Sequence, residues 1–106
     1  MQLIKKFIIL AVFVFLSSYS SQAIAGDYED NQAIDHYNQG VTYHKQGSID
    51  VAITEYKQAI EFNPNLSEAH YNLGLIYADK KDYTDAKIMF KRVTEIKPDN
   101  YEAHYN

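Results

Sequence analysis

The sequence predicts an all-α protein in which antiparallel helix pairs stack into an α-solenoid. The tripeptide His-Tyr-Asn recurs at residues 36–38, 70–72 and 104–106, and helical spacing of apolar residues recurs with it. This period of 34 residues falls within the range of about 20–50 residues that is typical of stacked repeat units. The period begins only after an N-terminal segment of different character.

Residues 1–25 have the layout of a secretory signal peptide. Two lysines precede an unbroken apolar run at residues 7–16, and small and polar residues follow up to Ala23 and Ala25. The run is shorter than the about 20 apolar residues that cross a bilayer, and the small pair suits a signal peptidase. We therefore expect cleavage after Ala25, an exported protein that is periplasmic or secreted, and no stable membrane span after leader cleavage. An uncleaved membrane anchor is the alternative.

The composition of the mature chain excludes several classes of function. Cleavage leaves 81 residues with eight basic and 14 acidic side chains, which is a formal net charge of −6. Such an acidic chain is not expected to bind nucleic acid or an anionic membrane surface, because both need Lys and Arg to replace counterions. The chain has no cysteine, which excludes disulfides, thiol catalysis, thiolate metal sites and lipid attachment through cysteine.

The mature chain divides into a lead-in and repeat units. Residues 26–32 form a short acidic lead-in without periodicity, 33–66 the first unit, 67–100 the second unit and 101–106 the start of a truncated third. In the second unit, one helix is predicted up to a polar break at residues 79–82, and another from there until Pro98. The apolar residues that support these two helices are Ala69, Leu73, Ile76 and Tyr77, then Tyr83, Ala86, Phe90, Val93 and Ile96.

Small and large residues occupy the same repeat positions in both units. Gly40 and Ala52, with Gly74 and Ala86 in the next unit, are expected where two helices approach closely. Large aromatic residues, Tyr56 and Phe90, are expected to fill the space alongside. Polar residues before the helices are expected to cap them through their free N–H groups, and these are Ser48, Ser67 and Asp82.

These residues resemble the tetratricopeptide repeat (TPR), a 34-residue pattern of small and large positions. The matching residues are Gly40, Tyr43, Ala52, Tyr56, Ala59 and Pro64, then Leu73, Gly74, Tyr77, Ala86, Phe90 and Pro98. The departures are His36 and His70 at the fourth position, Gln39 at the seventh and Val93 at the twenty-seventh. The resemblance implies a right-handed superhelix and a non-enzymatic scaffold that binds a protein or peptide in its concave groove.

The resemblance also places a set of side chains along that groove. They are Tyr37, Val41, Tyr71, Asn72, Leu75 and Tyr105. Tyrosines offer a flat apolar face and a hydroxyl to a bound peptide, although they equally serve as amphipathic cover on a helix. One TPR subgroup captures a terminal carboxylate, but only Asn72 matches its binding residues, so that activity is not carried over.

Metal binding and catalysis have little support. His36, His70 and His104 recur once per unit and should lie about 10 Å apart, whereas zinc ligands lie about 2.0–2.1 Å from the ion. We therefore expect them to pack between helices rather than share a metal. The chain has no phosphate loop, no H-E-x-x-H and no nucleophile elbow, so neither an enzyme nor a cofactor is expected.

The unfinished third unit bears on the size of the protein. Because about three units and a capping helix are normally required, we expect a fragment of a longer protein, or a truncated product that self-associates through its uncovered C-terminal face. A natural short module covered by a second copy or another protein is the alternative. For function we expect an exported interaction module; the alternative is a structural repeat arm of a larger cell-envelope protein, either an assembly factor or an enzyme.

Overall fold

A computed structural model of the chain describes the backbone of residues 2–98 and the side chains of residues 4–6 and 24–98. The described residues form four helices and no strand. The helices are α1 (Gln2–Lys45), α2 (Ile49–Phe62), α3 (Ser67–Asp79) and α4 (Tyr83–Ile96). The predicted all-α class is confirmed.

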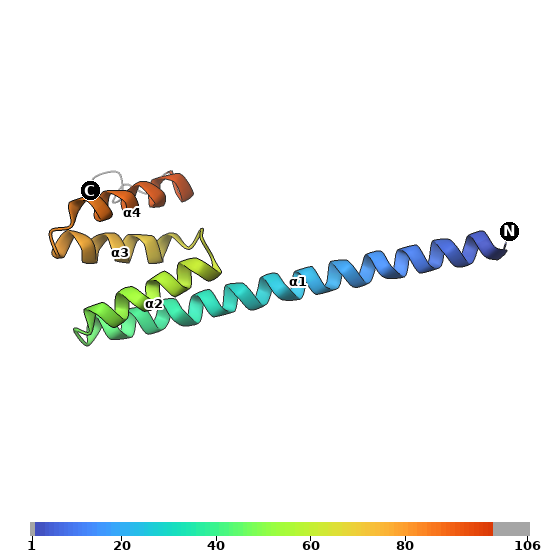
Figure 1. The fold of residues 1–106 in the computed structure, drawn as a ribbon, viewed down its shortest axis with the longest axis horizontal. Helices are drawn as coiled ribbons and strands as arrows, with labels where there is room; N and C mark the ends of the chain where they lie inside the picture. The colour runs from blue at the N-terminus through green and yellow to red at the C-terminus, as the bar shows by residue number, and fades with distance from the viewer. Residues whose placement is uncertain (1, 99–106) are drawn as a thin grey trace.

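Helix α1 is much longer than the sequence predicted. Its 44 residues, at about 1.5 Å rise per residue, account for most of the 72 Å length of the molecule, and its N-terminal part extends alone beyond the other helices (Figure 1). The lead-in at residues 26–32, predicted outside the first helix, lies inside α1. The physical reason is that this stretch lacks a helix breaker: no proline occurs before Pro64, and Gly26 is the one glycine before Gly40.

The absence of periodicity in this stretch of α1 reflects the absence of packing. Residues 24–31 are exposed, and Ala33, at 1% exposure, is the first buried side chain among those described. Within the part of the chain whose side chains are described, no helix is long and apolar enough to span a membrane. The side chains of the apolar run at residues 7–16 are not among those described.

The helices pack in sequence order, α1 on α2, α2 on α3 and α3 on α4 (Figure 1). The two helix pairs turn in the same way. The first helix of each pair is followed by a residue in the left-handed region, Gly47 (φ 80°) after α1 and Lys81 (φ 63°) after α3. The next N–H closes the helix by donating to a carbonyl five residues back, Ser48 to Tyr43 at 2.9 Å and Asp82 to Tyr77 at 2.8 Å. This is the Schellman arrangement, repeated with the 34-residue period.

Only one of the three expected N-caps forms its hydrogen bond. Asp82 precedes α4 and accepts from the backbone N–H of Asp85 at 3.3 Å. Ser48 occupies the N-cap position of α2 without a side-chain bond. Ser67 is the first residue of α3, and its hydroxyl donates to the Glu68 carboxylate at 3.2 Å instead. The expected cap at Ser67 is therefore wrong by one position along the helix.

The core lies where the small residues let the paired helices meet. A methyl group on Gly40 would lie 2.7 Å from ring atoms of Tyr56, and one on Gly74 would lie 2.6 Å from the Phe90 ring. The buried apolar side chains among the described residues are Ala33, Ala52, Tyr56, Ala59, Ala69, Leu73, Ile76, Ala86, Phe90 and Val93. Among the other residues of the repeat pattern, Tyr43 and Tyr77 are half-buried, and both prolines are exposed.

Candidate peptide-binding groove

Helices α1 and α3 carry the residues predicted to line a groove. Tyr37 and Val41 lie one turn apart on α1, and Tyr71 and Leu75 lie one turn apart on α3, so each pair shares a helix face. All four side chains are half-buried, which leaves part of each surface open to a partner. Tyr105, the remaining aromatic residue predicted here, lies outside the described residues.

Each groove tyrosine packs against the large aromatic residue of its own helix pair. The Tyr37 and Tyr56 rings lie 5.9 Å apart with an interplanar angle of 46°. The Tyr71 and Phe90 rings are also 5.9 Å apart, at 56°. Tilted aromatic pairs at this separation stabilise each other. Both tyrosine rings are therefore held against the core, which lowers the entropy cost of binding a partner.

Asn72 connects the two helix pairs. Its side-chain Nδ2 donates to the Tyr37 hydroxyl at 3.4 Å and to the Tyr56 hydroxyl at 3.3 Å. Both amide hydrogens are thus directed at α1 and α2, and Asn72 lies within hydrogen-bond distance of Tyr37, another residue predicted to line the groove. Asn72 acts here as a link within the protein, which leaves no free amide hydrogen for a bound carboxylate.

The phenol of Tyr56 is held in its neutral form. Burial raises the pKa of Tyr56 and the neighbouring Tyr37 raises it further, while the hydrogen bond from Asn72 opposes them. Sequence reasoning placed Tyr56 in the core but missed its polar role. The sequence does contain a signal for this role. The corresponding residue of the second unit, Phe90, has no hydroxyl, so the hydroxyl of Tyr56 distinguishes the two units.

Two lysines form ion pairs with acidic side chains. Lys97 lies 2.7 Å from the Glu68 carboxylate, and Lys80 at the end of α3 lies 3.0 Å from Asp50 on α2. The Lys97 bond is the main reason that the pKa of Glu68 is lowered. Pairs this exposed contribute little stability.

The two described histidines of the repeat pattern make different contacts. His36 lies 2.7 Å from the Glu55 carboxylate through Nδ1 and stacks on Phe62 with ring centroids 5.5 Å apart. His70 instead donates from Nε2 to the Pro64 carbonyl at 2.9 Å. Among the described side chains, no group of three His, Asp or Glu residues is placed to hold a metal ion. His104 lies outside them.

Two family models match the sequence. A family described as TPR repeat matches residues 40–81, and one described as tetratricopeptide repeat matches residues 67–100. The second match begins where α3 begins, at Ser67. No curated protein matches the chain at a significant level.

Proposed function

We propose, because the chain belongs to the tetratricopeptide repeat family, that it is an exported, non-enzymatic scaffold that binds an extended or helical segment of another protein. The repeats themselves point to protein partners in general. The binding face is assigned to the sides of α1 and α3 that carry Tyr37 and Tyr71. The observation that carries this assignment is the matched pair of tyrosines, each held against a core aromatic ring at 5.9 Å.

The chemistry of this face favours a neutral or basic partner segment. The acidic balance of the chain repels acidic peptides over distances of about 8–10 Å at moderate salt, and it favours partners with basic or neutral polar character. Val41 and Leu75 add aliphatic surface beside the tyrosines. Because the Asn72 amide is committed to two tyrosine hydroxyls, recognition of a terminal carboxylate at this position is not part of the proposal.

Export is proposed from the leader at residues 1–25. Helix α1 crosses Ala25 without a break, yet the first buried residue among the described side chains is Ala33. Cleavage after Ala25 therefore removes none of the described core and leaves enough of α1 to pack on α2. Sequencing the N-terminus of the protein recovered from the cell exterior or periplasm tests this. A chain that starts at Met1 and stays in the membrane would contradict it.

The groove is tested by alanine substitution against a matched control. Peptides selected from a random phage-displayed library on the full chain serve as probes, and their affinities are measured for Tyr37→Ala, Tyr71→Ala and Tyr83→Ala. Tyr83 lies on α4 and is 67% exposed, so it controls for loss of a surface tyrosine. We expect about tenfold or greater weakening at Tyr37 and Tyr71, in the range of interface anchors, and none at Tyr83.

Loss of structure must be separated from loss of contact. Tyr37→Phe and Tyr71→Phe retain the rings that pack on Tyr56 and Phe90, so both variants should keep most of the peptide affinity. Tyr71→Phe should melt close to the unchanged chain, and Tyr37→Phe slightly below it, because Tyr37→Phe loses the hydrogen bond from Asn72. Equal weakening by all three alanine variants, or peptides that bind regardless of Tyr37 and Tyr71, would place the binding face elsewhere.

A further inference from the structure

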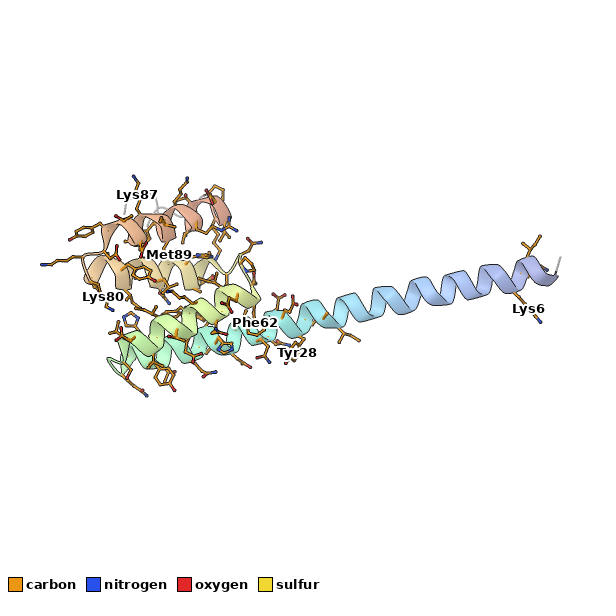
Figure 2. The ribbon with its side chains drawn as sticks, viewed as in Figure 1. Lys6, Tyr28, Phe62, Lys80, Lys87 and Met89 are labelled. Carbon is orange, nitrogen blue, oxygen red and sulfur yellow. The ribbon has the colours of Figure 1, made fainter. Side chains whose placement is uncertain are left out.

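A second candidate site lies on α3 and α4, apart from the groove. It is a hollow of about 380 Å³, here called the α4 pocket, lined by His70, Ile88, Met89, Lys91, Arg92 and Glu95. Its volume is within the range of about 300–1,000 Å³ seen for small-ligand sites. Ile88 is 54% exposed, whereas Met89 is half-buried on the side of α4 toward α3 (Figure 2). The pocket therefore combines an apolar wall with basic side chains.

His70 has an unpaired nitrogen at this pocket. The side chain is 6% exposed, and Nε2 donates to the Pro64 carbonyl. Because a carbonyl oxygen only accepts, Nε2 carries the hydrogen, and neutral His70 then has a bare acceptor at Nδ1. That atom is buried and has no hydrogen-bond partner. Buried polar atoms in proteins are nearly always paired, so the unpaired Nδ1 marks an incomplete interaction.

The first helix pair shows what completes the interaction. The 34-residue offset matches His70 with His36 and Met89 with Glu55. In the first pair, the Glu55 carboxylate lies 2.7 Å from Nδ1 of His36. In the second pair, a methionine replaces that glutamate, Nδ1 of His70 has no partner, and the α4 pocket lies at the same place. The site thus has the form of a histidine–carboxylate pair without its carboxylate.

The charges around His70 favour an anion. From α4, Arg92 and Lys91 bring two positive charges to the pocket and Glu95 brings one negative charge. On α3, the nearby acid Glu68 is already paired with Lys97 at 2.7 Å. Burial lowers the pKa of His70, the bond to Pro64 opposes this, and Arg92 lowers it further. An anion beside Arg92 would reverse the last effect, so ligand binding and protonation of His70 should support each other.

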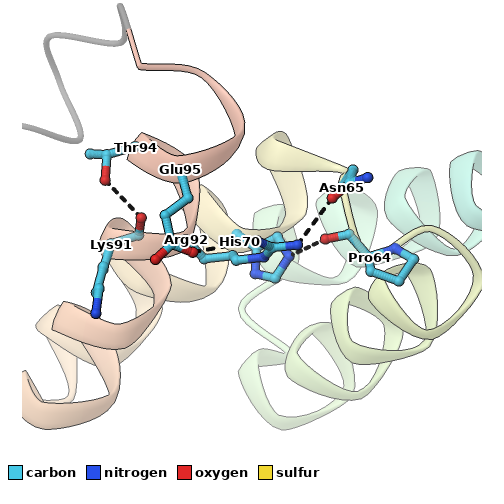
Figure 3. A network of polar contacts seen from close by, with 7 residues as sticks. All are labelled: Pro64, Asn65, His70, Lys91, Arg92, Thr94 and Glu95. Atoms are coloured by element: carbon cyan, nitrogen blue, oxygen red, sulfur yellow. Dashed lines mark hydrogen bonds and ion pairs between the residues drawn. The ribbon is translucent and has the colours of Figure 1, made fainter.

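Arg92 covers His70 by contacts that a ligand can replace. Figure 3 shows its side chain running past the His70 ring toward Asn65. The guanidinium donates to the Asn65 side-chain oxygen at 3.0 Å and to the Glu95 carboxylate at 3.3 Å. Both bonds are exposed, and exposed pairs of this kind contribute little stability. A ligand carboxylate can therefore draw the guanidinium aside and reach Nδ1.

We propose that the α4 pocket binds a carboxylate joined to a short apolar group. The apolar group contacts Ile88 and Met89, and the carboxylate pairs with Arg92 and Lys91. His70 takes one proton from solvent, so that its Nδ1 donates a hydrogen bond to the carboxylate, at the place where the Glu55 carboxylate lies beside Nδ1 of His36 in the first helix pair. The ligand is either a free carboxylic acid or an acidic side chain of a bound peptide.

Hexanoate and hexanamide are the matched probes. We measure the NMR signals of His70 in the full chain, labelled at histidine Cε1, while each probe is added at several pH values. Hexanoate should shift the His70 signals saturably and raise the pKa of His70. Its affinity should increase as the pH falls, by up to about tenfold per pH unit for one linked proton. Hexanamide has no charge to pair and should bind at least tenfold more weakly. N-acetyl-glutamyl-leucinamide, tested in the same way, distinguishes a peptide side chain from a free acid as the preferred source.

Variants decide whether the pocket itself is responsible. Met89→Glu places a carboxylate where Glu55 stands in the first pair, so it should raise the pKa of His70 without ligand and abolish the response to hexanoate. Lys87→Gln removes a charge from the same helix at a side chain that projects away from the other helices (Figure 2) and should leave the response unchanged. Equal responses to hexanoate and hexanamide, no shift at His70, or equal loss in Lys87→Gln would each overturn the proposal.

Discussion

The close contact between α3 and α4 can be tested by adding one methyl group. In Gly74→Ala, the new Cβ would lie 2.6 Å from Cε1 of Phe90, 2.9 Å from Cδ1 and 3.0 Å from Cζ. Carbon atoms prefer a separation of about 3.5–4.0 Å, so the ring must move by about 1 Å. Phe90 is only 6% exposed and rests on Tyr71, which leaves little room for that movement.

Two opposing effects set the magnitude at Gly74. Overpacking a core contact costs about 1–3 kcal/mol, whereas alanine favours a helix over glycine by about 1 kcal/mol. The net expectation is a loss of about 1 kcal/mol of unfolding free energy. In Phe90→Leu, the Cε1 and Cζ atoms are gone, so the same Gly74→Ala change should become neutral or stabilising by up to about 1 kcal/mol.

Urea unfolding followed by circular dichroism measures this reversal of sign in a double-mutant cycle of Gly74→Ala and Phe90→Leu. Residues in contact couple by about 0.5–3 kcal/mol, and we expect about 1–2 kcal/mol here. Tyr83→Ala provides the control background, because Tyr83 is an exposed aromatic residue on the same helix. If Gly74→Ala has the same effect in the Phe90→Leu background as in the unchanged chain, the ring contact does not explain the glycine.

Further predictions concern the turns, the core and His70. Lys81→Gly should stabilise the chain by about 1 kcal/mol, because a side chain at φ 63° is strained, and Gly47→Ala should destabilise it by a similar amount in the same urea assay. Ala86→Leu should cost about 1–3 kcal/mol at a position that is 4% exposed, whereas Lys87→Leu at the exposed neighbour should stay within about 0.5 kcal/mol. Burial holds the folded-state pKa of His70 below its ordinary value, so the unfolded chain binds more protons below about pH 6.5. Stability should therefore decrease as the pH falls from about 6.5 toward the folded-state pKa, and thermal melts of His70→Gln should show a smaller decrease; identical pH profiles would contradict this.

The repeat period predicted most of the fold because packing repeats with it. Gly40 and Gly74 each face the ring of a large aromatic residue, and both first helices end in the same left-handed turn. Residue size is read directly from the sequence, whereas the left-handed conformation of Lys81 is not. The lead-in at residues 26–32 was placed outside the helix because apolar periodicity reports burial. A solvated helix without a breaker carries no such signal.

The candidate sites could be predicted less completely because they depend on side-chain geometry. That Asn72 lies near Tyr37 follows from the repeat, but its bonds to two hydroxyls depend on the rotamers of three side chains. Likewise, His36 and His70 occupy the same repeat position, yet one bonds a carboxylate and the other a backbone carbonyl. Comparing Glu55 with Met89 could have suggested that difference, but only the structure shows that Nδ1 of His70 has no partner.

The two outer faces of the stack, on α1 and on α4, differ in how apolar they are. The α3 side chains that complete the core with α2, Ala69, Leu73 and Ile76, are at most 2% exposed. Their counterparts on α1 are Asp35, Gln39 and Thr42, all polar and exposed, so this face of α1 cannot receive another unit with similar apolar burial.

The opposite outer face, on α4, differs less from its counterpart on α2. On α2, Ile53 and Ile60 pack against the core, whereas their counterparts on α4 are Lys87 and Thr94. Val93, at 0% exposure, is buried in the core and offers no surface to this face. Self-association through α4, expected from the sequence, would therefore bury less apolar surface than the contact between α2 and α3. A partner that approaches α4 gains more from its polar edge and from the adjoining α4 pocket than from apolar burial, and this favours specific recognition over simple stacking of a second copy.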